Sequence, residues 1–202
     1  MALVLADKGA HVLLACRNLE KAEAAKREIL KSSPNAQIEV EILDLADLSD
    51  VEMFATRIKN SHERVDILIN NAGLFTNETV ANMSLEGIRQ QMEVNAIAPL
   101  NVTMNFLPLM TEGSKVANIT SRMGSIADNT SGGYFGYRAS KAALNAIGKS
   151  LAIDLKPAGV AVAQIHPGYV QTRMVGFTGD ITPADAAAGI AARIDELTLE
   201  NS

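Results

Sequence analysis

The sequence predicts an α/β fold in which helices cover both faces of a doubly wound parallel sheet. Short apolar runs rich in Val, Ile and Leu alternate with longer amphipathic segments along the whole chain, which is the pattern of repeated strand and helix units. The chain has 202 residues, of which 48% are hydrophobic and 20% are charged, as in an ordinary globular protein. We therefore expect a single domain over residues 1–202.

Five apolar runs are predicted to form the strands of this sheet. Both faces of each strand should be buried, because helices lie on both sides of a sheet of this kind. In chain order the predicted strands are 11–15, 38–43, 67–70, 116–120 and 160–165. A helical stretch at 2–8, closed by Gly9 as a C-terminal cap, comes before the first strand.

The segments between the strands have the apolar periodicity of helices. These predicted helices cover 19–32, 50–61, 85–110 and 137–156, and a further helical stretch follows at 183–197. Asn18 and Ser84 lie where a side-chain oxygen would accept a hydrogen bond from a free amide at a helix start. Ser49 and Glu52 have the spacing of a capping box.

Charge and residue usage exclude several classes of function. The net charge of -5 offers no basic surface for phosphates, so nucleic acid is not an expected partner. The sequence has a single cysteine, Cys16, and it shows neither a signal peptide nor an apolar stretch of about 20 residues. These features favour a cytoplasmic protein without a transmembrane segment. His11, His62 and His166 have no metal-ligand spacing, so no protein-held metal is expected.

Ligands of open α/β sheets bind beyond the carboxyl ends of the strands, so the residues there are the first candidates for a site. Arg17 follows the first predicted strand. Its guanidinium would bind a 2′-phosphate and so favour NADP(H) over NAD(H), or it would lie solvated on the surface. Asp44 follows the second strand, where it would accept a hydrogen bond from an adenine amino group or cap a turn.

The residues after the third and fourth strands are stronger candidates for a functional site. The third runs into Asn70-Asn71-Ala72-Gly73, where small residues let another backbone or a cofactor approach. The fourth is followed by Ser121, and a later helix start carries Tyr137 and Lys141 on one helical face. A nearby ammonium lowers the pKa of a phenol, which would make Tyr137 a usable acid or base, while Ser121 would hydrogen-bond a substrate oxygen.

These residues, in this order and with Asn95 and the Pro167-Gly168 pair, resemble the short-chain dehydrogenase/reductase family from Ala2 to about Arg193. The resemblance implies a Rossmann-type domain that binds a nicotinamide cofactor and moves hydride to or from a carbonyl or alcohol carbon. Residues 9–48 look like retinol-dehydrogenase-type members, and residues 121–146 look like the carbonyl reductases related to C-factor and sniffer. The implied substrate is a small or lipophilic carbonyl compound or alcohol.

The resemblance also assigns roles by position. Tyr137 would donate the proton in carbonyl reduction, and Ser121 would orient the substrate oxygen. Lys141 would hold the nicotinamide ribose and lower the Tyr137 pKa, and Asn95 would hold a water in the proton relay. The implied cofactor-binding positions are Arg17, Asp44, Asn71, Ala72, Gly73, Tyr137, Lys141, Pro167, Gly168, Val170 and Thr172. NADP(H) is the preferred cofactor with NAD(H) as the alternative, and helices 85–110 and 137–156 would pair in a homo-oligomer.

The sequence departs from the family pattern at both ends. The family's first strand and its TGxxxGxG turn, which cradles the cofactor pyrophosphate, have no counterpart, and the last strand is also missing. Because that first strand is central in the family's sheet, its two neighbours should each keep an unpaired edge. Ser121 and Tyr137 are also 16 positions apart, more than is usual. Tyr134 stands at the usual distance, but Arg138 rather than Lys follows it by four residues.

Two functions therefore compete, and a third is weaker. The first is an NADP(H)-preferring oxidoreductase, and the second is a catalytically silent interaction module derived from this fold. Cofactor binding separates them. A hydrolase that uses Ser121 lacks both a GxSxG elbow and a His partner. Substrate identity, physiological direction and oligomeric state stay open.

Overall fold

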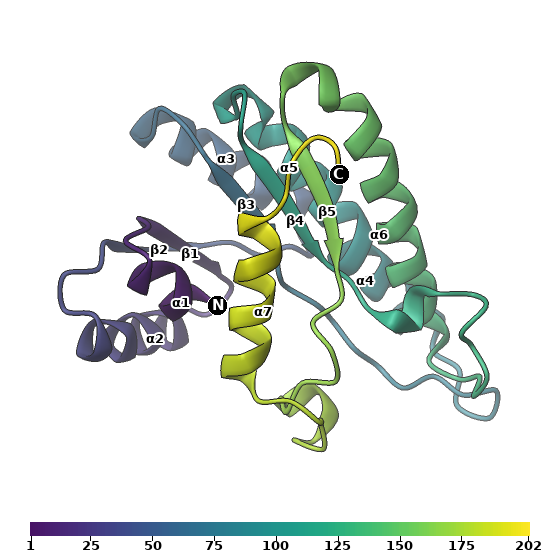
Figure 1. The fold of residues 1–202 in the computed structure, drawn as a ribbon. Coiled ribbons are helices and arrows are strands. Elements are labelled where there is room, and N and C mark those ends of the chain that lie inside the picture. Colours follow the sequence, from purple (N-terminus) through teal and green to yellow (C-terminus); the bar gives the residue numbers. More distant parts are fainter.

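The structure, a computed structural model, describes residues 1–202 and has the predicted alternation of strands and helices (Figure 1). Each strand agrees with its prediction to within one residue at either end. The strands are β1 (Val12–Cys16), β2 (Ile38–Ile42), β3 (Ile67–Asn70), β4 (Lys115–Ile119) and β5 (Ala161–Ile165).

The helices follow the prediction less closely, since the segment expected as one helix at 85–110 is broken. It divides into α4, a π-helical turn at Glu93–Ile97, α5 and a short 3₁₀ turn. Pro99, near the start of α5, has no N–H to donate to the carbonyl of Asn95, which favours a break at this point. The α-helices are α1 (Ala2–Asp7), α2 (Leu19–Ser32), α3 (Leu48–Ser61), α4 (Leu85–Met92), α5 (Ala98–Phe106), α6 (Phe135–Asp154) and α7 (Pro183–Asp195).

The helix ends predicted from the sequence can be compared with the caps in the structure. Asn18 and Ser84 cap α2 and α4 as predicted, accepting hydrogen bonds from backbone amides at 2.9 and 3.0 Å. Gly9 has a φ of +83° just beyond the end of α1, also as predicted. The capping box at Ser49 was wrong: Asp47 caps α3, because its carboxylate accepts from two backbone amides of the first turn.

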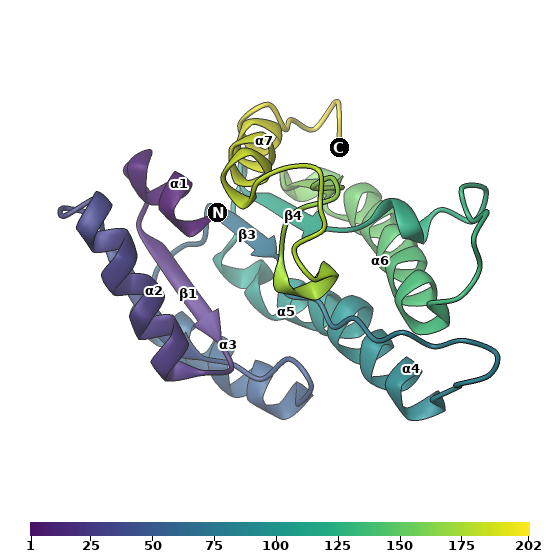
Figure 2. The same cartoon turned by 90° about the horizontal axis from the view of Figure 1, so that it is seen from below.

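The strands form two parallel sheets, β1–β2 and β3–β4–β5, with no strand pair between them. In Figure 2 the arrowheads of β1, β3 and β4 point toward the same side of the molecule. The predicted unpaired edges are thus confirmed on β1 and β3, each of which pairs on one side only. Burial on both faces was expected of every strand, but only β4 and β5 are largely buried. β1, β2 and β3 are mostly half-buried because they lie at sheet edges.

Helices cover both faces of the three-stranded sheet. Ala117 and Ile119 of β4 pack against Ile190 and Ile194 of α7 on one face. Val116 of β4 points to the other face, where it packs in a cluster with α6 residues. This alternation along β4 is the doubly wound arrangement that the sequence predicts.

The two sheets are joined through side chains rather than through strand pairing. Leu13 of β1 and Leu68 of β3 both pack against an apolar cluster formed mainly by α3 and α5. Phe54 of α3 and Phe106 of α5 lie at its centre, with ring centroids 5.6 Å apart. The position of the β1–β2 sheet therefore depends strongly on α3.

Gly148, in the middle of α6, gives a stability prediction because Gln164 of β5 fills the space beside it. A Cβ atom there would lie 2.0 Å from Gln164 Oε1, which accepts a hydrogen bond from Asn118 Nδ2 at 3.1 Å. We expect Gly148→Ala to lower the free energy of unfolding by about 1–3 kcal/mol through overpacking. A gain in helix propensity of about 1 kcal/mol offsets part of this loss, so the net fall in the free energy of unfolding should be about 0–2 kcal/mol.

Chemical denaturation would measure this change. Gly189→Ala in α7 is the matched control, since a Cβ there meets no atom within 4 Å. The control should be neutral or slightly stabilising. Equal stability of the two variants would contradict the proposed clash.

Candidate active site

The carboxyl end of β4 and the start of α6 bring Ser121, Tyr137 and Lys141 into one region. Ser121 follows β4, and its Oγ accepts a hydrogen bond from Met123 N at 3.1 Å, which begins a short 3₁₀ turn at Arg122–Gly124. Gly124 lets this turn lie against α6, because a Cβ there would come within 2.8 Å of the Lys141 backbone. Ser121 is thereby held beside the first turns of α6.

Tyr137 lies in the first turn of α6 with its ring buried. The ring meets Phe75 edge-on, with centroids 4.9 Å apart. Burial raises the pKa of the Tyr137 phenol above its ordinary value, and a side-chain hydrogen bond with Ser121 acts in the opposite direction. The phenol is therefore protonated near neutral pH and is ready to donate to an oxygen.

Lys141 is only 3% exposed, and burial lowers its pKa to about 8. Its Nζ donates a hydrogen bond to the Ile119 carbonyl oxygen at 2.8 Å and lies 5.9 Å from the centroid of the Tyr137 ring. The expectation that Lys141 lowers the pKa of Tyr137 is wrong for this structure. The ammonium is held at the β4 backbone, and desolvation dominates the pKa of the phenol.

The Asn70-to-Gly73 segment after β3 lies against the same region. Asn70 Nδ2 donates to Asn118 Oδ1 at 2.8 Å, which ties the ends of β3 and β4 together. A Cβ atom on Gly73 would stand 3.8 Å from Asn95 Oδ1 and 4.0 Å from Lys141 Nζ. Both distances are ordinary van der Waals contacts, so the close approach of a backbone or cofactor to Gly73 stays a prediction. Asn71 and Ala72 are exposed beside it.

Asn95 is fully buried in the π-helical turn between α4 and α5, a distortion that is frequent at functional sites. Its Oδ1 accepts from Leu74 N at 2.7 Å, and its Nδ2 donates to Leu74 O at 2.8 Å and to Ser140 Oγ at 3.0 Å. Asn95 therefore fastens the loop after β3 to α6. The water-holding role stays a prediction.

Glu78 is a functional candidate that the sequence did not indicate, since it lies in a polar loop without a recognisable motif. Its side chain is buried and accepts from Gly136 N at 3.2 Å and Gln91 Nε2 at 2.9 Å, and from the Thr76 hydroxyl. Burial alone would raise the pKa of Glu78, but these hydrogen bonds hold it below its ordinary value. The carboxylate thus anchors the start of α6 at Gly136, one residue before Tyr137.

Arg17 and Asp44 belong to the β1–β2 sheet rather than to this cluster. Arg17 is exposed just after β1 and has no hydrogen bond or ion pair with another residue. Asp44 Oδ1 accepts from Ala46 N at 3.0 Å, so of its two predicted roles the turn cap is present. Neither residue bonds to Ser121, Tyr137 or Lys141.

The segment after β5 folds back toward Gly73. Gly168 has a φ of +87°, and Val170 forms an isolated parallel bridge with Ile181. Pro167 lies between β5 and this turn, and Thr172 precedes a 3₁₀ turn at Arg173–Val175. Met174 in that turn places its Cε 3.7 Å from the position of a Cβ on Gly73. The predicted 167–172 segment therefore leads directly to the Tyr137 and Lys141 region.

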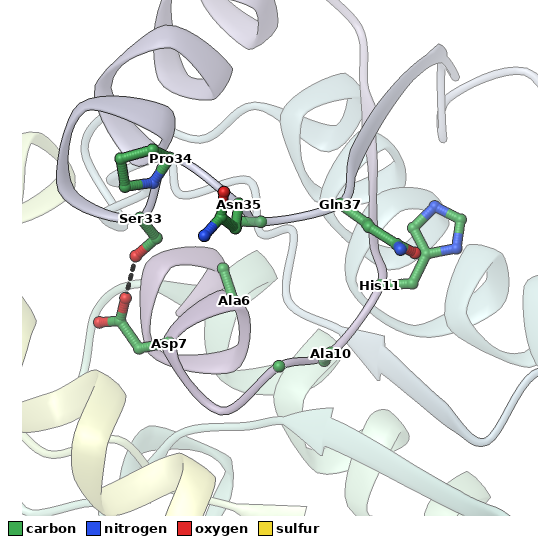
Figure 3. A pocket seen from close by; sticks show the side chains of 10 residues that line it. Ala6, Asp7, Ala10, His11, Ser33, Pro34, Asn35 and Gln37 are labelled. Atoms are coloured by element: carbon green, nitrogen blue, oxygen red, sulfur yellow. Dashed lines mark hydrogen bonds between the residues drawn. The ribbon is translucent and has the colours of Figure 1, made fainter.

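An open hollow lies elsewhere, at the amino ends of β1 and β2. It has a volume of about 420 Å³ and lies between α1 and the loop that follows α2 (Figure 3). Asp7 and Ser33 hydrogen-bond across it. Ser121, Tyr137 and Lys141 do not line this hollow, so we place the candidate active site at the opposite ends of the strands.

A parallel α/β fold with Ser, Tyr and Lys at the carboxyl end of a central strand defines an oxidoreductase of the dinucleotide-binding class. The family model described as short chain dehydrogenase matches residues 1–180. The chain belongs to the short-chain dehydrogenase/reductase family. No helix in the structure has the length and apolar character needed to span a membrane.

Two curated relatives illustrate the match. The 1-hydroxy-2-glutathionyl-2-methyl-3-butene dehydrogenase of Rhodococcus sp. (strain AD45) is 40% identical over 164 residues, which cover 79% of this chain and 73% of the relative. Retinol dehydrogenase 13 of Homo sapiens is 33% identical over 199 residues, which cover 88% of this chain and 57% of the relative.

Two solved structures have the same fold. The carbonyl reductase Sniffer of D. melanogaster superposes with a TM-score of 0.87 at 27% identity, covering 100% of this chain and 88% of that one. The NADPH-bound carbonyl reductase from chicken fatty liver has a TM-score of 0.83 at 27% identity, covering 95% of this chain and 82% of that one. The two kinds of member that the sequence resembles, retinol dehydrogenases and Sniffer-type carbonyl reductases, are thus both among its relatives.

Proposed function

We propose that this chain is an NADP(H)-preferring oxidoreductase that interconverts a small or lipophilic carbonyl compound and its alcohol. One observation carries the proposal: a protonated Tyr137 phenol, the Ser121 hydroxyl and the buried Lys141 ammonium lie together at the end of β4. The NADPH in the related chicken carbonyl reductase supports the choice of cofactor. The exposed and unpaired Arg17 supports it from within this chain.

The residues around Lys141 fit the nicotinamide ribose. An ammonium has three N–H donors, and the Ile119 carbonyl takes one of those of Lys141. Two donors remain for hydroxyl groups of a ligand. Gly73 lies beside this ammonium, since a Cβ atom on it would stand 4.0 Å from Lys141 Nζ. No glycine-rich turn cradles a pyrophosphate in the same way, since Gly9 lies at the C-terminal end of α1.

The bound nicotinamide would supply the hydride in reduction and accept it in oxidation. During reduction the Ser121 hydroxyl donates a hydrogen bond to the substrate oxygen and stabilises the charge that develops there. The Tyr137 O–H then gives its proton to that oxygen, and in oxidation the phenolate takes it back. Because Tyr137 is protonated near neutral pH, it is ready to act as the proton donor in reduction. Oligomerisation through the α4–α5 and α6 faces stays a prediction.

Calorimetric titration of the purified chain with NADPH and with NADH tests this proposal, since the chain has no Trp to report binding by fluorescence. We expect micromolar binding of NADPH and weaker binding of NADH. Arg17→Asp should weaken NADPH binding by about tenfold or more, because a charge-assisted hydrogen bond contributes roughly 1.5–3 kcal/mol. The same variant should reverse the cofactor order.

Arg27→Asp is the matched control, because Arg27 is exposed further along α2 and the change in charge is identical. It should bind both cofactors as the parent chain does. A folded chain that binds neither cofactor would favour the alternative of a catalytically silent interaction module. Equal loss of NADPH affinity in both variants would show that Arg17 acts only through net charge.

A further inference from the structure

A cluster of three potential metal ligands lies at the amino ends of β1 and β2, away from Tyr137. His11 directly precedes β1, Glu39 is the second residue of β2, and His62 caps the end of α3. One ligand atom from each residue lies within 4.8 Å of the other two. Figure 3 shows the His11 side chain projecting away from the Asp7–Ser33 pair. His11 turns instead toward the Glu39 carboxylate.

The donor set suits a divalent transition metal. His11 Nε2 lies 2.9 Å from Glu39 Oε1, and His62 Nε2 lies 3.3 Å from Glu39 Oε2. Two imidazole nitrogens and one carboxylate are a known ligand combination for Zn²⁺, which binds them at about 2.0–2.2 Å. A tetrahedral ion with such bonds separates its ligand atoms by about 3.3 Å. Small side-chain adjustments would therefore close the three residues around one ion, with solvent at the fourth position.

The hydrogen bonds of Ser61 orient His62 for this role. Ser61 Oγ lies 3.1 Å from the Arg57 carbonyl oxygen and 3.3 Å from that of Ile58. The same Oγ lies 2.8 Å from His62 Nδ1, so a hydrogen bond between them fixes the ring in place. A histidine that ligates a metal usually has its second nitrogen fixed by such a partner.

This arrangement leaves His62 Nε2 facing a carboxylate oxygen at 3.3 Å. His11 Nε2 faces the other oxygen of the same carboxylate at 2.9 Å. The three ligand atoms therefore surround one point between the side chains.

We propose that His11, Glu39 and His62 bind a divalent transition-metal ion such as Zn²⁺, and that the ion ties the β1–β2 sheet to α3. The two sheets share no strand pair, and α3 packs on α5 beside the three-stranded sheet. An ion held by β1, β2 and α3 would fix the smaller sheet to the rest of the molecule. Its role is structural, since no residue of the Tyr137 site takes part.

Calorimetric titration of the chelator-treated chain with Zn²⁺ tests the proposal, with thermal unfolding as the second readout. We expect one ion per chain and a higher unfolding temperature when Zn²⁺ is present. Glu39→Gln, His11→Asn and His62→Gln should each weaken binding by roughly tenfold or more and abolish the thermal shift. Ser61→Ala should weaken binding by roughly tenfold, because it removes the group that orients His62.

Glu41→Gln is the matched control: Glu41 lies two residues along β2 and pairs with Arg57 rather than with a histidine. This variant should bind Zn²⁺ as the parent chain does. A folded parent chain that shows neither saturable binding nor a thermal shift would overturn the proposal and leave imidazolium–carboxylate pairs as the explanation. Undiminished Zn²⁺ affinity in both Glu39→Gln and His62→Gln would overturn it as well.

Discussion

Replacing Tyr137 by Phe is expected to lower kcat/KM for carbonyl reduction by roughly 10²–10⁴-fold, the contribution of one positioned general acid. Phe keeps the ring and its edge contact with Phe75, so only the proton donor is lost. NADPH affinity should fall far less than the rate, since Lys141 and the other implied cofactor-binding residues are unchanged. NADPH oxidation with a panel of aliphatic and aromatic aldehydes and ketones would measure the rate, and calorimetry would measure the affinity.

Tyr134→Phe is the control for this experiment, because Tyr134 stands at the family's usual distance from Ser121. The Tyr134 ring stacks on Phe75 with centroids 5.4 Å apart, so it shares the surroundings of Tyr137. Tyr134 has a left-handed φ of 53° and precedes α6, so it does not share a helical face with Lys141. Its activity should stay close to that of the parent chain. The opposite result, with Tyr134→Phe inactive and Tyr137→Phe active, would mean that the wrong tyrosine has been assigned.

The strands could be predicted from the sequence because they depend on local pattern. Short apolar runs between amphipathic segments predict them to within a residue, and Asn18 and Ser84 predict two helix starts from local hydrogen bonding. The break at Glu93–Ile97 was missed because it depends on tertiary contacts as well as on Pro99. The side chain of Asn95 bonds to Leu74 and Ser140, and nothing in the sequence shows that these residues are neighbours.

The candidate site was predicted in its residues but not in its electrostatics. Spacing places Tyr137 and Lys141 on one face, yet burial, which the sequence does not give, decides the direction of both pKa values. Glu78 was missed for a related reason, since only folding brings a loop carboxylate to the start of α6. The same holds for His11, Glu39 and His62, which are distant in sequence and adjacent in space.

Replacing Lys141 by Met is expected to abolish cofactor-dependent activity and at the same time to stabilise the fold. The pKa of Lys141 falls from 10.5 when unfolded to about 8 when folded, so burial of the charged form costs about 3 kcal/mol near pH 7. Met removes that cost, while the Ile119 carbonyl loses its donor at a cost of about 1 kcal/mol. The variant should therefore be more stable by about 2 kcal/mol near pH 7, as measured by chemical denaturation.

The pH dependence of the free energy of unfolding tests independently whether burial of charged Lys141 destabilises the fold. Between about pH 8 and pH 10.5 the unfolded chain binds more protons at Lys141 than the folded chain does, so the free energy of unfolding rises with pH in that window. The rise should be absent from Lys141→Met and present in Lys149→Met, which changes an exposed lysine on the same helix. Burial raises the pKa values of Tyr137 and Cys16, which oppose the rise at high pH, so the difference between variants is the quantity to compare.

A stable but inactive Lys141→Met chain would show whether the buried Lys141 ammonium stabilises the fold or serves to bind the cofactor. A buried charge that stabilised the fold would leave the Lys141→Met variant less stable than the parent chain. If the charge opposes folding, its presence is explained by ligand binding. The two remaining N–H donors of Lys141 can bind a ligand in the space beside Gly73. Stability gained together with NADPH affinity lost would therefore assign Lys141 to the cofactor and not to the core.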